Sequence, residues 1–232
     1  ISHAEEVSVA VAANFTAPMQ QIATQFEKDT GHKATLAFGA TGKFYAQIIN
    51  GAPFEVMLSA DDETPAKLEK EGHGVTGSRF TYAVGTLVLW SANPTLVDAR
   101  GEILKAGDFK HLALANPKTA PYGAAAVETM TRLGLLPSLQ GRFVQGENIA
   151  QTTQFVVTGA AAAGITALSL VMAPEVAQRT RFKRIPSEWH APLHQKLVLL
   201  KGANPETRQF RDFLLSPPAQ AVFRRHGYDT SP

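Results

Sequence analysis

The stretch Ala37–Ile48, which reads AFGATGKFYAQI, joins an apolar run to a helical pattern through a short turn that contains two glycines. Phe44, Tyr45 and Ile48 recur at helical spacing after the turn. The stretch therefore predicts a strand, a tight turn and a helix in direct succession. Such a turn leaves the first N–H groups of the helix without helical partners and points the positive end of the helix dipole outward, which favours an anion.

Thr41 stands in this turn and has two interpretations. It can cap its own helix, because threonine is an ordinary N-cap residue, or its hydroxyl can donate to a bound anion. The same two roles are open to Asn14, which follows a β-branched strand with Val7, Val9 and Val11 and precedes a helical pattern. Neither junction decides between a cap and a ligand by itself.

Strands and helices alternate along the rest of the chain. We expect strands at residues 33–38, 54–58, 111–115 and 195–200, and a loop at 116–123, where helix-breaking residues gather. The run 80–90 is too long for one ordinary strand, so we expect it to pass from one domain to another. Repeated strand–helix units predict an α/β fold with parallel sheets, in which ligands bind beyond the carboxyl ends of the strands.

Composition narrows the class of protein. With 232 residues, 44% of them hydrophobic, the chain fits one large domain or two smaller ones. Its 22 basic and 20 acidic residues form no long run of one sign, so no electrostatic footprint for nucleic acid is present. No apolar run has the length of a transmembrane helix. The absence of cysteine excludes disulfides, thiol catalysis and cysteine-ligated metals.

Metal and enzyme hypotheses find little support in the sequence. His190 and His194 have the spacing of a helical zinc pair, but Pro192 between them argues against a continuous helix. The acids at 61–63 match the first turn of a helix, where negative charge complements the helix dipole. No nucleophile motif, zinc-protease motif or phosphate-binding loop is present, so we expect no enzyme.

In such a fold, four strand-to-helix junctions lie beyond the carboxyl ends of strands, and they are at Asn14, Thr41, Tyr122 and Ile149. The first two belong to one half of the chain and the last two to the other, as a cleft between two lobes would require. None of them presents a carboxylate. A fully ionised oxyanion has no proton to donate, so its site should consist of hydroxyl, amide and backbone N–H donors. The junctions meet that demand.

The sequence resembles the periplasmic molybdate-binding proteins of ABC importers, the ModA family. The motifs that carry the resemblance span nearly the whole chain, and they are residues 12–15, 38–48, 50–53, 58–61, 77–83, 87–91, 116–117 and 120–123, with Phe223 and Gly227-Tyr228. The arrangement around Tyr122 is most similar to the branch known from Azotobacter.

The resemblance implies a two-lobed periplasmic binding protein fold of type II, each lobe a mainly parallel sheet flanked by helices. Lobe 1 would comprise residues 5–82 and 195–232, lobe 2 residues 83–194, and the ligand cleft would lie between them. It implies a monomeric periplasmic protein that captures molybdate, and tungstate, by lobe closure and delivers it to a membrane permease. No cofactor and no direct cation ligand are implied, because molybdenum would be bound as an oxyanion.

The resemblance also implies a ligand set. The expected contacts are side-chain and backbone donors of Asn14 and Thr41, the phenol of Tyr122 and the backbone N–H of Ile149, with Ala13 and Gly42 as weaker backbone candidates. The chain departs from the family at Ala13, where the Azotobacter branch has threonine, and at Ala167, where another branch has a ligand tyrosine.

Two further questions stay open. Sulfate or a small organic anion is the alternative ligand, and Arg79 is the arginine to check as an anchor for an organic anion. Residues 1–4, Ile-Ser-His-Ala, have small residues at the two positions that a signal peptidase reads. We expect them to be the tail of a secretory signal, with a cloning remnant as the alternative.

Overall fold

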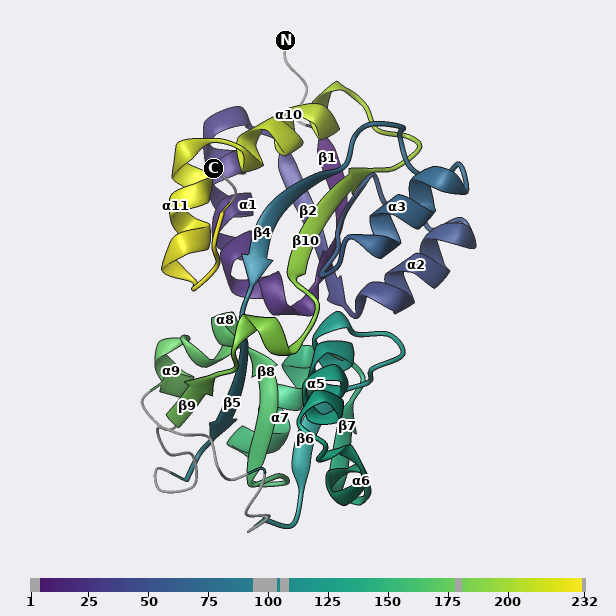
Figure 1. The fold of residues 1–232 in the computed structure, drawn as a ribbon. Coiled ribbons are helices and arrows are strands. Elements are labelled where there is room, and N and C mark those ends of the chain that lie inside the picture. Colours follow the sequence, from purple (N-terminus) through teal and green to yellow (C-terminus); the bar gives the residue numbers. More distant parts are fainter. Residues whose placement is uncertain (1–4, 94–103, 105–108, 178–180, 231–232) are drawn as a thin grey trace. The chain divides into compact units, whose positions relative to one another are not determined.

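The computed structural model describes residues 5–93, 104, 109–177 and 181–230, so the expectation for residues 1–4 lies outside the described residues. The chain forms two compact units. Unit 1 consists of the residues up to Val84 and those from His194 onward, and unit 2 is Gly85–Leu193. Each unit contains one five-stranded sheet with helices packed on it (Figure 1), which confirms the predicted α/β class.

The sheet of unit 1 has the order β2-β1-β3-β10-β4. Its strands are β1 (Glu6–Ala12), β2 (Lys33–Gly39), β3 (Val56–Leu58), β4 (Phe80–Gly85) and β10 (Leu193–Leu199). Strand β1 runs parallel to β2 and β3, whereas β10 is antiparallel to β3. The predicted parallel arrangement thus applies to the first three strands, and the returning strand β10 makes the sheet mixed.

Helices cover both faces of this sheet. They are α1 (Thr16–Thr30), α2 (Thr41–Ile49), α3 (Glu63–Lys70), α10 (Pro205–Leu214) and α11 (Pro217–Arg225), with the short 3-10 helix η1 (Ala13–Phe15) before α1. Figure 1 shows α1, α10 and α11 on one side and α2 and α3 on the other. Alternation along β1 divides the core, because Val7, Val9 and Val11 face α1 and Ala10 faces α2.

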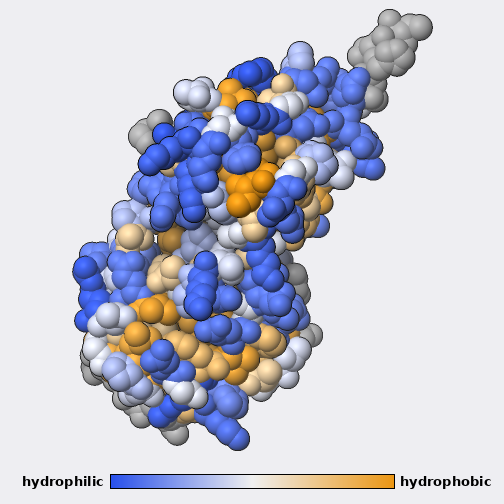
Figure 2. Space-filling view, turned by 90° about the vertical axis from the view of Figure 1, so that its right-hand side faces the viewer, coloured by the Kyte–Doolittle hydropathy of each residue, from blue (hydrophilic) through white to orange (hydrophobic). Residues whose placement is uncertain are grey.

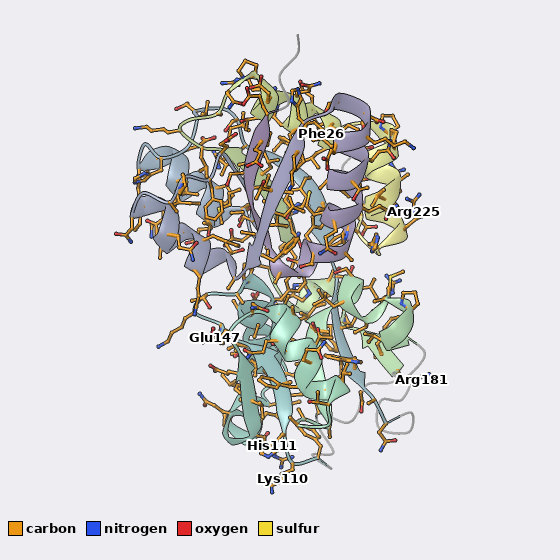
Figure 3. The ribbon with its side chains drawn as sticks, turned by 180° about the vertical axis from the view of Figure 1, so that it is seen from behind. Phe26, Lys110, His111, Glu147, Arg181 and Arg225 are labelled. Atoms are coloured by element: carbon orange, nitrogen blue, oxygen red, sulfur yellow. The ribbon has the colours of Figure 1, made fainter. Side chains whose placement is uncertain are left out.

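The larger core lies under α1, α10 and α11. Phe26 on α1, labelled in Figure 3, packs edge-on against Phe210 of α10 with ring centroids 5.2 Å apart. Aromatic pairs of this geometry add to the gain from burying apolar area. The two C-terminal helices predicted from the sequence are therefore fixed to the N-terminal half of unit 1.

The sheet of unit 2 has the order β7-β6-β8-β5-β9. Its strands are β5 (Leu87–Ser91), β6 (Leu112–Ala115), β7 (Phe143–Gly146), β8 (Ala163–Ala167) and β9 (Arg181–Arg184). Strand β6 is parallel to β7 and β8, and β5 is antiparallel to β8 and β9. The helices are α5 (Pro121–Arg132), α6 (Leu136–Leu139), α7 (Ile149–Val157), α8 (Leu168–Val171) and α9 (Pro174–Ala177), with 3-10 helices η2 (Gln140–Arg142) and η3 (Ser187–Trp189).

Several sequence expectations are corrected in detail. The run 80–90 forms two strands in different sheets, β4 and β5. The loop expected at 116–123 is shorter, because α5 already begins at Pro121. Proline fits there, since the first N–H groups of a helix need no helical partner. His190 and His194 share no helix, because His194 lies in β10.

Apolar side chains are exposed on both units of the described surface. On the face that Figure 2 displays, hydrophobic residues gather in a broad patch on unit 2 and in a smaller patch on unit 1, with hydrophilic residues around both. The exposed large apolar side chains come from separate elements and are Ile49, Val157, Met172, Phe182 and Leu215. Among the helices of the described ranges, none is long and apolar enough to cross a membrane.

Candidate functional site

The parallel strands of unit 1 bring three junctions to one edge of its sheet. Ala12 at the end of β1 is paired with Gly39 at the end of β2, and Val11 is paired with Leu58 at the end of β3. Because carboxyl ends of parallel strands meet at the same edge, the segments that follow these strands are neighbours. Asn14 and Thr41 therefore belong to the same edge, as the sequence predicts.

Asn14 is held by side chains from distant parts of the chain. It is 1% exposed, and its Nδ2 donates to Gln195 Oε1 and to Tyr228 Oη, both at 2.7 Å. The Tyr228 hydroxyl donates in turn to the Asn14 carbonyl oxygen at 2.7 Å. Both hydrogens of the side-chain amide are thereby used within unit 1. The N-cap role is wrong, because Asn14 lies inside η1 and the residue before α1 is Phe15.

Thr41 is the first residue of α2 and is also not its cap. The N-cap is Ala40, whose side chain makes no capping bond. Thr41 is 2% exposed, and its Oγ1 accepts from the backbone N–H of Ala60 at 3.1 Å. A hydroxyl has one hydrogen to donate and two acceptor positions. The Ala60 bond uses an acceptor position, and within the described ranges no acceptor for the Thr41 hydrogen is found.

The first turn of α2 adds backbone donors beside this hydroxyl. Lys43 and Phe44 already donate to the Ala40 carbonyl at 3.1 Å. The N–H groups of Thr41 and Gly42 precede them and receive no side-chain cap. They mark the positive end of a nine-residue helix. Thr41 thus combines a buried hydroxyl with two helix-terminal N–H groups, which suits an anion.

In unit 2, α5 starts directly against the end of β6. Tyr122 is the second residue of this helix and is 1% exposed. A Cβ atom at Gly123 would lie 2.1 Å from the carbonyl oxygen of Ala115, the last residue of β6. Only glycine allows this approach without displacing the helix. The close contact at Gly123 therefore fixes the backbone position of the preceding residue, Tyr122, at the start of α5.

Ile149 occupies the equivalent place after β7, as the first residue of α7. The cap residue Asn148 accepts from Gln151 N at 3.0 Å, and Gln151 Oε1 accepts from Glu147 N at 2.7 Å. Figure 3 labels Glu147, which lies between β7 and α7. These two bonds use the N–H groups of Glu147 and Gln151, and neither involves the N–H of Ile149. Since Ala115 is paired with Gly146, the starts of α5 and α7 share one sheet edge.

The acids and the arginine considered from the sequence have structural roles. Helix α3 begins at Glu63, so of the three acids only Glu63 lies in its first turn. Asp61 precedes the helix, where it accepts from Ser59 Oγ at 2.6 Å and from Thr64 N at 3.1 Å. Burial raises the pKa of the Asp61 carboxyl, and these hydrogen bonds oppose the rise. Arg79 pairs with Glu69 at 3.0 Å. In the part of the chain that the structure describes, no group of three potential metal ligands occurs.

Sequence reasoning missed the residues that hold Asn14. Gln195 lies in β10, is fully buried, and alternates with the buried Leu193 and Leu197. A polar residue at an inward-facing position of an apolar strand needs a partner, and this pattern was the available signal. Ala13 is buried in η1, and Ala167 ends β8. An alanine side chain offers no hydroxyl at either position.

Comparison with known proteins identifies the family. The model for bacterial extracellular solute-binding proteins matches residues 7–229. The chain belongs to this family. The chain is similar to the molybdate-binding protein ModA of Azotobacter vinelandii, with 55% identity over 98% of this chain and 91% of that protein. ModA of Rhodobacter capsulatus is 48% identical over 98% of this chain and 89% of its own length.

The fold agrees with this membership. The solved Azotobacter vinelandii periplasmic molybdate-binding protein superposes with a TM-score of 0.93 and 38% identity, over 97% of this chain and all of that one. The resemblance to ModA proteins and the periplasmic binding protein fold predicted from the sequence are therefore confirmed.

Proposed function

We propose that this chain is an extracytoplasmic solute-binding protein that captures molybdate, and tungstate, and delivers it to the permease of an ABC importer. The observation that carries the proposal is the 55% identity to a molybdate-binding ModA protein over 98% of the chain. The two sheet edges supply the matching chemistry, because their candidate residues are hydrogen-bond donors without a carboxylate among them.

We assign the donors of unit 1 to Thr41 and Asn14. The Thr41 hydroxyl accepts from Ala60, so its hydrogen is directed to another group, for which the oxyanion is the proposed acceptor. Asn14 would contribute its backbone N–H in η1, because both hydrogens of its side-chain amide serve Gln195 and Tyr228. Backbone N–H groups at Ala13 and Gly42 complete the proposed set for this unit.

Tyr122 and Ile149 are the proposed donors of unit 2. The phenol of Tyr122 comes from the first turn of α5, and the N–H of Ile149 from the first turn of α7. An oxyanion bound by donors of both units would stabilise the closed arrangement by the contacts that exist only there. Sulfate carries the same charge, so cavity size and donor placement would have to separate it from molybdate.

The remaining parts of the proposal follow from the family. We propose a periplasmic, monomeric protein without a cofactor, in which binding and release replace catalysis. Its relatives are named as molybdate-binding proteins, and one solved relative as periplasmic. An organic anion anchored by arginine has less support, because Arg79 already pairs with Glu69.

Thermal unfolding with separate oxyanions tests the function. Molybdate, tungstate, sulfate, phosphate and zinc are added singly at one concentration. A ligand at about a hundred times its dissociation constant stabilises the folded state by about 2.7 kcal/mol. For a chain of this length that raises the midpoint by about 5–10 °C. We expect this shift with molybdate and tungstate. An equal shift with sulfate would indicate a general oxyanion trap, and no shift with any oxyanion would refute the function.

A further inference from the structure

Buried hydrogen bonds lead from Asn14 to Tyr82 of β4, which packs against Phe15 in the same core. Asn14 Nδ2 donates to Gln195 Oε1 at 2.7 Å, and Gln195 Nε2 donates to Tyr82 Oη at 2.9 Å. The three side chains come from η1, β10 and β4, and each is at most 3% exposed. They form one connected polar path inside the apolar core of unit 1.

The path continues from Tyr82 to Thr41. Tyr82 Oη donates to the carbonyl oxygen of Ser59 at 2.9 Å. The peptide bond after Ser59 contains the N–H of Ala60, which donates to Thr41 Oγ1 at 3.1 Å. One amide plane therefore carries the tyrosine bond on its oxygen and the threonine bond on its nitrogen. The two proposed oxyanion residues of unit 1 are the two ends of a single path.

We propose that Gln195 and Tyr82 are positioning residues of the oxyanion site, which hold the η1 turn at Asn14 and the hydroxyl of Thr41 in register with each other. The inference rests on the proposed function. Gln195 and Tyr82 are not among the residues proposed to contact the oxyanion. They act on it only through Asn14 and Thr41.

The direction of each bond along the path is determined. Burial raises the pKa of the Tyr82 phenol well above its ordinary value, so the hydroxyl keeps its hydrogen. That hydrogen goes to Ser59 O, so Tyr82 must accept from the amide nitrogen of Gln195. The oxygen of Gln195 then faces Asn14, which has to present its Nδ2. Reversing the Gln195 amide would place its oxygen against Tyr82 Oη, which already donates to Ser59 O, and its nitrogen against Asn14 Nδ2, so both contacts would lose their hydrogen bond.

Tyr228 supports the same end of the path. Its hydroxyl accepts from Asn14 Nδ2 and donates to the Asn14 carbonyl oxygen, both at 2.7 Å. Side chain and backbone of Asn14 are thus tied together, so turning the side chain would also move the η1 backbone. The position of the proposed N–H donor therefore depends on Gln195.

Two substitutions and one control test the positioning role. Tyr82→Phe removes the hydroxyl with little change in volume, and Gln195→Met replaces the amide by an apolar chain of similar length. Tyr45→Phe is the control, because it removes a tyrosine hydroxyl that bonds Glu71 on the exposed side of α2, the helix that begins with Thr41. Molybdate and sulfate affinities are measured by calorimetry, and unfolding midpoints by heating.

We expect Tyr82→Phe and Gln195→Met to weaken molybdate binding by about 3–10-fold, the loss of one or more net hydrogen bonds. Their ratio of molybdate to sulfate affinity should change by about threefold or more, whereas Tyr45→Phe keeps the wild-type ratio. A merely structural role would lower the midpoint and leave that ratio unchanged. Wild-type affinities and ratio in both variants would overturn the inference.

A ligand-free measurement separates this inference from the proposed function. In amide NMR spectra without any oxyanion, Tyr82→Phe should shift the side-chain NH₂ signals of Asn14 and the backbone N–H signal of Ala60, and Tyr45→Phe should not. Unchanged Asn14 and Ala60 signals overturn the positioning role, even when the wild-type protein binds molybdate. If the Asn14 and Ala60 signals shift but the wild-type protein binds no oxyanion, the proposed function is refuted, whereas the hydrogen-bonded path from Tyr82 to these residues is supported.

Discussion

Replacing Gly123 with alanine tests how the start of α5 is held against β6. The new Cβ would lie 2.1 Å from Ala115 O, whereas ordinary contacts begin at 3.4 Å, so the helix start must move by about 1.3 Å. Strain of this kind costs about 1–3 kcal/mol. For a chain of 232 residues each kcal/mol lowers the unfolding midpoint by about 2–4 °C, which gives a fall of about 2–12 °C.

The same movement would carry Tyr122, the residue before Gly123, away from the oxyanion. Loss of one hydrogen bond to a charged group costs about 1.5–3 kcal/mol, or about 10–150-fold in affinity. The assays are thermal unfolding without ligand and calorimetric titration with molybdate. A falling midpoint with unchanged affinity would support the steric argument and refute the role of Tyr122.

Gly141→Ala in the same unit is the matched control. A Cβ there meets no atom within 4 Å and the backbone has no positive φ, so the midpoint should stay within about 2 °C of wild type. If Gly123→Ala unfolds at the same temperature as Gly141→Ala, the reasoning about the close approach of α5 and β6 is refuted.

Three further predictions concern single groups. Thr41→Val should weaken molybdate binding by about 10–150-fold and leave the Ala60 N–H without its acceptor, whereas Thr41→Ser should retain binding. Equal molybdate affinities of the two variants in calorimetry would contradict the role of the Thr41 hydroxyl. Ile149→Pro removes the backbone N–H at the first position of α7, where helices accept proline, and the preceding Asn148 has the extended backbone that proline requires. We expect this variant to bind molybdate more weakly than Ile149→Ala in calorimetry, while circular dichroism shows both variants folded. Burial, and then the charge of Arg225, lower the pKa of His226 from 6.5. Because the unfolded chain then binds more protons, stability falls as pH drops below 6.5, and His226→Asn should flatten this part of the curve of unfolding free energy against pH.

Local patterns predicted most strands and helices because each element has its own period. The valines of β1 alternate, and the apolar residues of α2 recur at helical spacing. The sequence pattern predicts a loop over the first turn of α5, because Pro121 and Gly123 are both typical helix breakers. In the structure the proline is helical at the start, and the glycine is required by the nearby end of β6. That requirement comes from packing and has no local sequence signal.

The site residues show the same limit. Asparagine and threonine at strand-to-helix junctions are ordinary caps, yet neither Asn14 nor Thr41 has this role. Asn14 bonds Gln195, 181 positions away, and Thr41 accepts from Ala60 across the sheet edge. Partners at such separation are set by the fold, so the sequence indicated the location of these donors and not their orientation.

Unit 1 is assembled from two separate parts of the chain, and this determines when it can be completed. The ring of Phe15 packs edge-on against Tyr82 at 4.9 Å and against Phe223 and Tyr228 at 5.0 Å. A growing polypeptide therefore carries β1 to β4 with an incomplete core until α11 has left the ribosome. Unit 2 is continuous from Gly85 to Leu193 and can complete its fold earlier. The first strands to be synthesised are thus among the last to be stabilised.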